Sequence, residues 1–224
     1  MADPIGRPSW RDMETYQGYR ASIAPISLHV GQGGVDEGAK WELRRRVVVA
    51  RRAVPAAVRE AEAAALAATA LPVERPGTVC AYWPVGDEPG SPELLDALVR
   101  RGCRVLLPLI TWAGPLDWAD YTGADSLQAG PLGLREPTAP PLGCAVIATA
   151  VLVLVPALAV DWYGTRLGRG GGHYDRTLPL TSPGTPLVAV VRDDEVLPSV
   201  PVQPHDVPVT AALTPQRGLF PLPC

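Results

Sequence analysis

The chain has 224 residues, 47% of them hydrophobic, and a formal net charge of -3, so it is long enough to bury a core as one domain. The small negative charge gives no long-range attraction to nucleic acid or acidic membranes. The four cysteines, Cys80, Cys103, Cys144 and Cys224, form no Cys-x-x-Cys pair and have no nearby histidine, a pattern that disfavours zinc and redox sites and favours free thiols.

The first residues lack the features of a targeting segment. Residues 1–20 have no continuous apolar core of a secretory signal, so we expect a cytoplasmic protein. No hydrophobic period is sustained before residue 39, and we predict a disordered extension over 1–38 and a single domain over 39–224. The apolar stretch 145–160 is too short for a membrane span, and we interpret it as a buried parallel strand.

Two helices are predicted in succession after the extension. Apolar residues recur at helical spacing over 40–53, and an alanine-rich segment follows over 56–70, with Pro55 suited to its opening turn. Lys40 and Arg44 stand four residues apart, so they share one face of the first helix. They are candidates for contact with a polyphosphate, although a solvated basic face is the commoner explanation of such spacing.

A βαβ unit is predicted next. Residues 78–83 and 104–110 have strand character, and the helix between them begins after Ser91 and ends at Gly102. Loops at the carboxyl ends of parallel strands are where α/β proteins bind ligands, and Glu88 lies on such a loop. A solvated turn carboxylate is the alternative.

The following segment, residues 111–141, is irregular and rich in glycine and proline, with Trp112, Trp118 and Tyr121 spread through it. It is too long for a plain connector in a compact domain. A hairpin, a binding lid and an aromatic cover for the sheet edge all remain open.

A glycine-rich loop follows the apolar strand at 151–156. Residues 166–176 read Arg-Leu-Gly-Arg-Gly-Gly-Gly-His-Tyr-Asp-Arg. Its four glycines can adopt positive φ and expose N–H groups, and a helix opening at 173–175 would direct its positive end the same way, as in phosphate sites. The arginines add positive charge, and Asp175 offers a hard oxygen suited to Mg²⁺. Neither established glycine-rich phosphate fingerprint fits, so a solvated surface loop is the alternative.

The last part of the chain offers a second carboxylate. Residues 187–191 predict a strand, and 207–213 predict a last strand of edge type because it contains Pro208. Asp206 lies just before it. A carboxylate here would complete a metal site with Asp175 if the fold brought the two together, which the spacing does not show.

Four blocks of the chain, in order, resemble the 5-formyltetrahydrofolate cyclo-ligases, also called methenyltetrahydrofolate synthetases. The blocks are Lys40-x-x-x-Arg44, residues 82–88, residues 153–176, and His205-Asp206. The third block is highly specific, and the resemblance covers about residues 40–214. It implies an α/β domain with a three-layer, mostly parallel sheet and helices on both faces, Rossmann-like and similar to the ribose-5-phosphate isomerase and CoA transferase type.

The resemblance also implies a reaction. The enzyme would use ATP and Mg²⁺ to cyclise 5-formyltetrahydrofolate, with or without a polyglutamate tail, to 5,10-methenyltetrahydrofolate, releasing ADP and phosphate. We expect a monomeric ligase of one-carbon metabolism with no nucleic-acid or membrane partner.

Individual residues take their roles from the same resemblance. ATP would be bound by Lys40, Arg44, Arg166, Leu167, Gly168, Arg169, Gly170, Gly171, Gly172, His173 and Tyr174. The folate would contact Trp83, Glu88, Arg169, Gly170, Gly171, Gly172 and His173. Asp175 and Asp206 would bind Mg²⁺, and Arg169 and Asp175 would be catalytic. The chain departs from the family where it has His173-Tyr174 in place of the usual two tyrosines.

Two other classes compete with this hypothesis. A non-catalytic folate or phosphometabolite sensor on the same fold would explain His173 and the N-terminal extension, but it has no need of Lys40, Arg44, Asp175 and Asp206. Nucleic-acid binding through the arginines at 44–46 and 51–52 lacks an aromatic platform or a recognised motif.

Overall fold

The computed structural model describes residues 37–73 and 76–223, which belong to one compact unit. Its helices are α1 (Glu37–Arg52), α2 (Ala56–Ala68), α3 (Pro92–Arg100) and α4 (His173–Thr177). The two predicted helices after the extension are confirmed, with α1 beginning three residues earlier than expected. The disordered extension was predicted over residues 1–38, but Glu37 and Gly38 belong to α1, and residues 1–36 lie outside the described residues.

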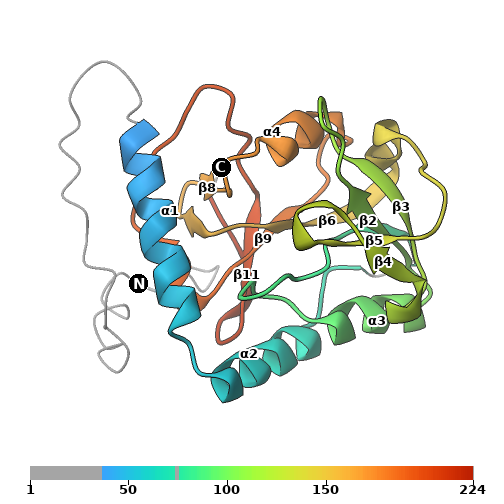
Figure 1. Cartoon of the computed structure of the whole chain (residues 1–224), viewed down its shortest axis with the longest axis horizontal. Helices are drawn as coiled ribbons and strands as arrows, with labels where there is room; N and C mark the ends of the chain where they lie inside the picture. The colour runs from blue at the N-terminus through green and yellow to red at the C-terminus, as the bar shows by residue number, and fades with distance from the viewer. Residues whose placement is uncertain (1–36, 74–75, 224) are drawn as a thin grey trace, which may run out of the picture. The chain divides into compact units, whose positions relative to one another are not determined.

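A seven-stranded sheet in the order β12-β11-β9-β6-β1-β2-β3 forms the centre of the fold (Figure 1). The five inner strands are β1 (Thr78–Cys80), β2 (Arg104–Leu109), β6 (Ala150–Pro156), β9 (Leu187–Val190) and β11 (Ala211–Thr214), and they are parallel. The outer strands, β3 (Asp117–Tyr121) and β12 (Gly218–Pro221), pair antiparallel to them. The predicted α/β class with a mostly parallel sheet is confirmed.

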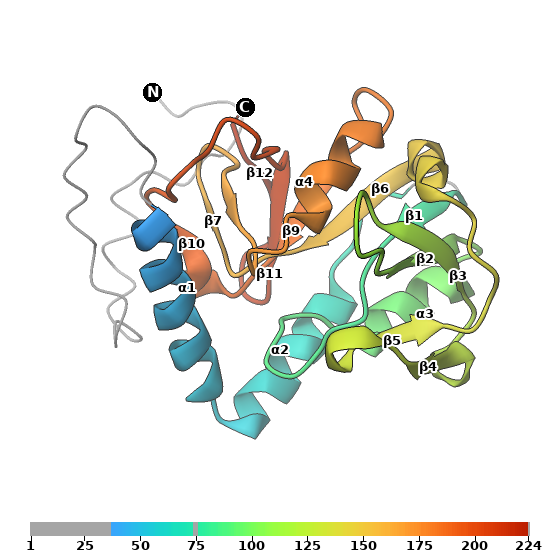
Figure 2. The ribbon, with the colours of Figure 1, turned by 45° about the horizontal axis from the view of Figure 1, so that its top comes forward.

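The two faces of the sheet are covered differently (Figures 1 and 2). On one face, α2 and α3 pack leucines such as Leu66 and Leu98 against Val79 and Leu152. The opposite face carries α4, short 3₁₀ helices and a three-stranded sheet of β7 (Ala159–Asp161), β8 (Arg166–Leu167) and β10 (Val196–Leu197). Helices therefore lie on both faces, but those on the second face are short.

Five 3₁₀ helices complete this part of the fold. They are η1 (Ala124–Ser126), η2 (Pro131–Gly133), η3 (Cys144–Thr149), η4 (Leu178–Leu180) and η5 (Asp193–Glu195). The free thiols of Cys80 and Cys103 are buried, and Cys144 is partly buried. None of the helices in the described part of the chain is long and apolar enough to cross a membrane.

Local signals set the helix of the predicted βαβ unit, whereas its first strand, expected over 78–83, ends at Cys80. Ser91 caps α3, because its Oγ accepts a hydrogen bond of 3.1 Å from the backbone N–H of Glu93. Gly102 ends the segment with φ 81°, a conformation that suits glycine. The pairing of Val79 with Val105 then sets β1 beside β2, so the loop that carries Glu88 follows the carboxyl end of a central strand.

Two strand predictions were wrong. Residues 145–160 do not form one strand: η3 comes first, β6 ends at Pro156, and β7 belongs to the smaller sheet. A continuous apolar run shows burial but does not show which buried element it forms. The strand expected to lie at the edge, β11, pairs on both sides, since Pro208 precedes it and removes no N–H from its ladder.

The irregular segment contains a hairpin, one of the alternatives that its sequence left open. β4 (Leu127–Ala129) pairs antiparallel with β5 (Arg135–Pro137). Trp118 and Tyr121 are buried in β3, where they cover the sheet, whereas Trp112 is exposed.

Candidate functional site

The glycine loop leaves the small sheet rather than the central one. β7 and β8 form an antiparallel pair, and β8, with buried Arg166 and Leu167, leads directly into the loop. This corrects the expectation that the strand at 151–156 delivers the loop. Only Gly170 (φ 101°) and Gly172 (φ 65°) adopt positive φ among the four glycines. At Gly171 a Cβ would lie 2.9 Å from Cδ2 of the His173 ring, so a side chain there would require that ring to move.

Helix α1 brings one predicted cation to this loop and a second to the segment before β11. Arg44 Nε donates to the carbonyl oxygen of Gly168 at 3.0 Å. Lys40 is buried, and its Nζ donates to Asp206 Oδ2 at 2.6 Å. The solvated basic face that the spacing alone favoured is therefore contradicted, because both side chains turn inward and meet the loop region.

The two predicted metal ligands lie in segments that contact one another. Asp175 Oδ1 accepts hydrogen bonds from Arg166 Nη2 at 2.6 Å and from the backbone N–H of Val207 at 3.2 Å. Val207 directly follows Asp206, so one backbone contact places both carboxylates in the same region. Across residues 37–73 and 76–223, no group of three or more His, Cys, Asp or Glu side chains could hold a metal by itself. Two carboxylates suit Mg²⁺, which commonly completes its shell with water and phosphate oxygens.

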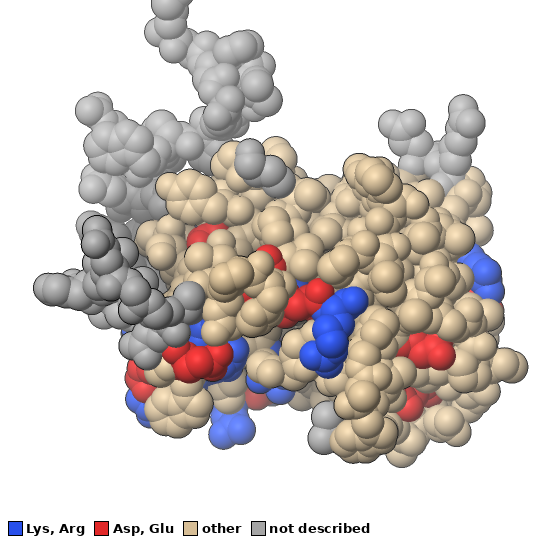
Figure 3. Space-filling view, turned by 90° about the horizontal axis from the view of Figure 1, so that it is seen from above, with Lys and Arg blue, Asp and Glu red and all other residues tan. Residues whose placement is uncertain are grey.

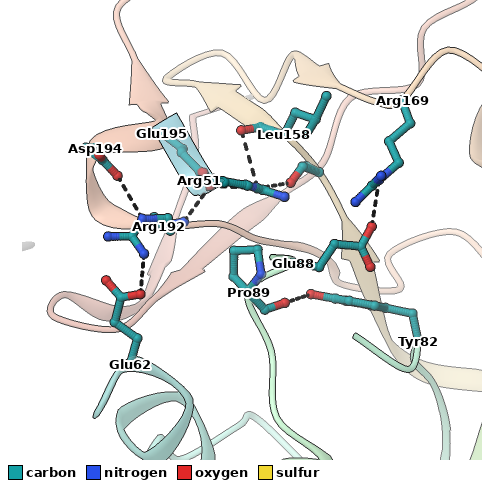
Figure 4. Close-up of polar contacts among 11 residues, drawn as sticks. Arg51, Glu62, Tyr82, Glu88, Pro89, Leu158, Arg169, Arg192, Asp194 and Glu195 are labelled. Carbon is teal, nitrogen blue, oxygen red and sulfur yellow. Dashed lines mark hydrogen bonds and ion pairs between the residues drawn. The ribbon is translucent and has the colours of Figure 1, made fainter. Parts of the chain in front are cut away.

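A second loop faces the glycine loop from the end of β1. Glu88 Oε1 accepts a hydrogen bond of 2.9 Å from Arg169 Nε (Figure 4). Glu88 Oε2 accepts one of 3.1 Å from Val85 N–H. Arg169 is 61% exposed, whereas the Glu88 side chain is only 13% exposed. The hydroxyl of Tyr82 donates to the carbonyl oxygen of Pro89 and fixes the same loop. The two loops that should bind substrate thus bind one another here.

Trp83 stands beside this loop in an aromatic group. Its ring centroid is 6.1 Å from that of Tyr121 and 5.4 Å from the guanidinium carbon of Arg135. Sequence reasoning singled out Trp83 but missed Arg135. The contact depends on pairing β5 with β4 and packing it near β2, which no local signal reveals.

His173 is held in one tautomer by its neighbour. Arg176 Nη2 lies 3.2 Å from His173 Nδ1, and since a guanidinium only donates, Nδ1 must accept. The neutral ring then carries its proton on Nε2. Burial, with the charge of Arg176, lowers the pKa of His173. The ring can therefore donate from Nε2, as a tyrosine hydroxyl could.

The Tyr174 side chain packs against the apolar cluster on the α4 face of the sheet. Its hydroxyl is buried and has no hydrogen-bond partner among the described residues, and the Nε atom of Arg166 is in the same condition. The guanidinium carbon of Arg166 is 5.9 Å from the tyrosine ring centroid. Burial, and then the charge of Glu88, raise the pKa of Tyr174, so its hydroxyl keeps its proton.

Sequence reasoning missed a buried ion pair behind the site (Figure 4). Arg51 Nε and Nη2 donate to Glu195 at 2.6 and 2.8 Å, and Nη2 also donates to the carbonyl oxygen of Ala157 at 2.6 Å. Glu195 in turn accepts from the backbone N–H of Arg192 at 2.8 Å. The only signal was that Arg51 follows Arg44 by seven residues on the same helix face, and such spacing does not distinguish a buried arginine from a solvated one.

The distribution of charged side chains and of cavities in the described part of the chain shows no open pocket around the glycine loop. The face seen in Figure 3 shows acidic and basic side chains close together near its centre, and most of that face is uncharged. A cavity of about 30 Å³ lies beside Glu88 and is also lined by Asp87 and Arg192. A larger one of about 190 Å³ lies between α2 and α3, away from the predicted residues. Neither surrounds the glycine loop, so we base the site on the converging side chains.

The family model described as the 5-formyltetrahydrofolate cyclo-ligase family matches residues 36–215 of this chain. The chain belongs to the 5-formyltetrahydrofolate cyclo-ligase family. A cyclo-ligase from Mycolicibacterium smegmatis is 50% identical over 189 residues, covering 82% of this chain and 97% of that protein. The cyclo-ligase of Escherichia coli K12 is 31% identical over 163 residues, covering 70% of this chain and 87% of that protein.

Solved structures agree on the cyclo-ligase fold. The structure of 5,10-methenyltetrahydrofolate synthetase from Aquifex aeolicus matches with a TM-score of 0.69 at 24% identity, covering 83% of this chain and 93% of that chain. A synthetase from Mycoplasma pneumoniae matches with a TM-score of 0.62 at 17% identity, covering 77% and 96% respectively. The resemblance and the assignment to a ligase family of folate metabolism are confirmed.

Proposed function

We propose that the protein cyclises 5-formyltetrahydrofolate to 5,10-methenyltetrahydrofolate, using ATP and Mg²⁺ and releasing ADP and phosphate. The observation that carries this proposal is the meeting of three distant segments at one loop. Helix α1 contacts Gly168 through Arg44, and it contacts Asp206 through Lys40. Asp206 adjoins the residue whose N–H binds Asp175. Family membership supplies the reaction, and this geometry supplies residues suited to it.

ATP would bind along α1 and the glycine loop. Lys40 and Arg44 would exchange their present partners, a carboxylate and a carbonyl oxygen, for phosphate oxygens. Residues 166–174 would contribute backbone N–H groups, which the glycine at 170 lets the chain present closely. Cations and N–H groups around the γ-phosphate would stabilise the charge that develops during phosphoryl transfer.

Mg²⁺ would be held by Asp175 and Asp206. Asp175 Oδ2 makes no hydrogen bond within the described residues, so it can face a cation while Oδ1 keeps its bonds to Arg166 and Val207. The ion would neutralise phosphate charge when it is bound. Arg166 would keep the Asp175 carboxylate oriented toward the ion through its hydrogen bond to Oδ1.

The folate would lie between the β1 loop and the glycine loop. Glu88 can accept hydrogen bonds from the N–H groups of the pterin, and Trp83 offers an aromatic face. Arg169, which now pairs with Glu88 at 2.9 Å, would be freed to contact the formyl oxygen and the γ-phosphate. The arginine that now joins the two loops would thereby become a catalytic residue.

The reaction requires no covalent enzyme intermediate. The formyl oxygen attacks the γ-phosphorus, the bond to ADP breaks, and an iminium phosphate forms. N10 then attacks the activated carbon and loses its proton, and the carbon–oxygen bond breaks to release phosphate and leave the methenyl bridge. The protein aligns the formyl oxygen with the γ-phosphate and N10 with the carbon, and no Ser or Cys nucleophile is needed.

Two substitutions test the assignment of the site. Arg169→Ala and Asp175→Ala should each remove most turnover, measured as methenyl absorbance, while the circular dichroism spectrum stays native. Arg45→Ala, on the exposed side of α1 where it pairs with Glu42, is the control and should keep wild-type turnover. Wild-type rates in both site variants would exclude the proposed site.

A further inference from the structure

Arg135, in strand β5, lies beside a residue of the proposed folate site. Its guanidinium carbon is 5.4 Å from the ring centroid of Trp83, which is proposed to offer the folate an aromatic face. Trp83 follows closely after β1, which ends at Cys80. Open α/β sheets bind their ligands outside the carboxyl ends of the strands. Arg135 is therefore one aromatic ring away from the place proposed for the substrate.

The next residue, Glu136, holds β5 in this position. Its Oε1 accepts a hydrogen bond of 2.8 Å from the backbone N–H of Ile110, which directly follows the last residue of β2. A Cβ at Gly130 would lie 2.7 Å from Cγ of Glu136, so the Glu136 side chain packs closely on the hairpin. Neighbouring side chains of a strand point to opposite faces. Glu136 therefore anchors the strand while Arg135 faces Trp83.

Arg135 has no carboxylate partner among the described residues. It is exposed, and its one hydrogen bond within the described part of the chain is a long one of 3.5 Å, from Nη2 to the carbonyl oxygen of Leu127. Arg217 makes a similar contact, 5.7 Å from the centroid of Trp162, but its Nε also lies 3.8 Å from Asp193 Oδ1. A cation–π contact uses the charge of a guanidinium but not its N–H donors. The donors of Arg135 are thus available to an anion.

The anion within reach of Arg135 belongs to the folate and not to ATP. Lys40, one of the cations proposed for the phosphates, pairs with Asp206, which precedes β11. The hairpin that carries Arg135 packs against β2 and β3, at the other end of the sheet from β11. A folate carries its carboxylates on the glutamyl part alone, and a guanidinium binds a carboxylate through two parallel N–H···O bonds.

We propose that Arg135 binds a carboxylate of the glutamyl part of the folate, which makes it a determinant of substrate affinity at the rim of the site. This inference rests on the proposed function. The pterin would lie inward, between Glu88 and the glycine loop, and the glutamyl part would leave the site past Trp83 to the surface where Arg135 is exposed. Further glutamates would extend from there into solvent.

The test compares two ligands that differ only in the glutamyl part. Calorimetry would measure the dissociation constants of 5-formyltetrahydrofolate and of 5-formyltetrahydropteroate, which lacks the glutamate, for the wild type and for Arg135→Gln. We expect the substitution to weaken binding of the folate by roughly 3- to 10-fold, the range for one exposed charged hydrogen bond. It should change binding of the pteroate less than twofold, and the wild type should bind the pteroate more weakly than the folate by at least the same factor.

Equal weakening for both ligands would overturn the inference, because Arg135 would then act on the ring system through Trp83. Unchanged binding of both ligands would overturn it as well. Arg100→Gln is the matched control, since Arg100 is exposed in the last turn of α3. The same folate-specific loss in this variant would show a general effect of surface charge and contradict a site at Arg135. These binding measurements need no turnover, so an absence of ATP-dependent methenyl formation by the wild type would count against the proposed function alone.

Discussion

Lys40 on α1 and Asp206, 166 residues later in the chain, are joined by an ion pair of 2.6 Å. Their side chains are only 4% and 10% exposed, so the pair is largely shielded from water. One partner is expected to bind phosphate and the other Mg²⁺, and in this structure each neutralises the other. When Mg²⁺ and ATP bind together, phosphate oxygens would replace Asp206 as the partner of Lys40, and Mg²⁺ would replace Lys40 as the partner of Asp206.

Replacing Lys40 should weaken nucleotide binding specifically. Lys40→Met removes a charge-assisted hydrogen bond, and we expect the KM for ATP to rise about 10- to 100-fold, with little change in the KM for 5-formyltetrahydrofolate. Steady-state kinetics would measure both. Arg45→Met, one turn further on the exposed face of α1, is the control. Equal effects on both substrates would contradict a role at the phosphates.

Asp175→Asn should raise the Mg²⁺ concentration needed for half-maximal activity. Asparagine can still accept the hydrogen bond from Val207 N–H, but it lacks the charge that favours a hard cation. The rise should be about tenfold or more, in line with the loss of a charged ligand, measured at saturating ATP and folate. Asp120→Asn removes a carboxylate that also pairs with an arginine, Arg104, at the β2–β3 edge. The same Mg²⁺ shift in both variants would argue against a metal site at Asp175.

The buried pair of Arg51 and Glu195 should behave differently in single and double variants. Arg51→Met leaves Glu195 buried without its cation and should lower the free energy of unfolding by about 3–5 kcal/mol. Arg51→Met combined with Glu195→Leu removes both charges and should restore most of that stability. Urea unfolding would measure the difference. A double variant less stable than the single one would show that the pair is needed for reasons beyond charge compensation.

The loss of unfolding free energy in Arg51→Met should also depend on pH. Burial raises the pKa of Glu195 in the folded protein, so its folded form binds a proton more readily than its unfolded form, and its contribution favours folding at low pH and is lost as the pH rises. Arg51 lowers the pKa of Glu195, so without Arg51 that pKa rises further and the pH dependence of stability becomes stronger. The stability gap to the wild type should therefore narrow between pH 7 and pH 5, and a gap that widens on acidification would contradict this.

Gly164 should tolerate no side chain. It has φ 81° in the turn between β7 and β8, and a Cβ would collide with the carbonyl oxygen of Val209. Gly184 has the same φ, but nothing lies within 4 Å of its Cβ position. We expect Gly184→Ala to cost about 1–2 kcal/mol of backbone strain, and Gly164→Ala to cost about 1–3 kcal/mol more. Thermal unfolding would compare them, and equal losses would contradict the collision.

Local signals in the sequence were enough for some elements. The cap at Ser91 and the stop at Gly102 defined α3 because both act within one turn of the helix. The glycine loop was also recognisable from its own residues. The division of the long apolar run at 145–160 into separate elements was not recognisable from the sequence. Burial alone does not distinguish a strand of the main sheet from one in a second sheet.

Contacts between distant segments were beyond the sequence pattern. Whether Asp175 meets Asp206 depends on Val207 reaching Asp175 Oδ1, a tertiary contact without a local marker. The burial of Arg51 depends on Glu195, 144 residues away. Family resemblance supplied the site residues, but it did not show that Arg169 and Glu88 pair with one another.

The most direct measurement is the formation of the methenyl chromophore by the purified full chain mixed with 5-formyltetrahydrofolate, Mg²⁺ and ATP. The proposed function predicts that absorbance rises only when ATP is present and that one ADP appears for each methenyl product. It also predicts no rise when a non-hydrolysable ATP analogue replaces ATP. Folate binding by calorimetry without any ATP-dependent absorbance change would contradict catalysis and indicate a non-catalytic folate-binding protein.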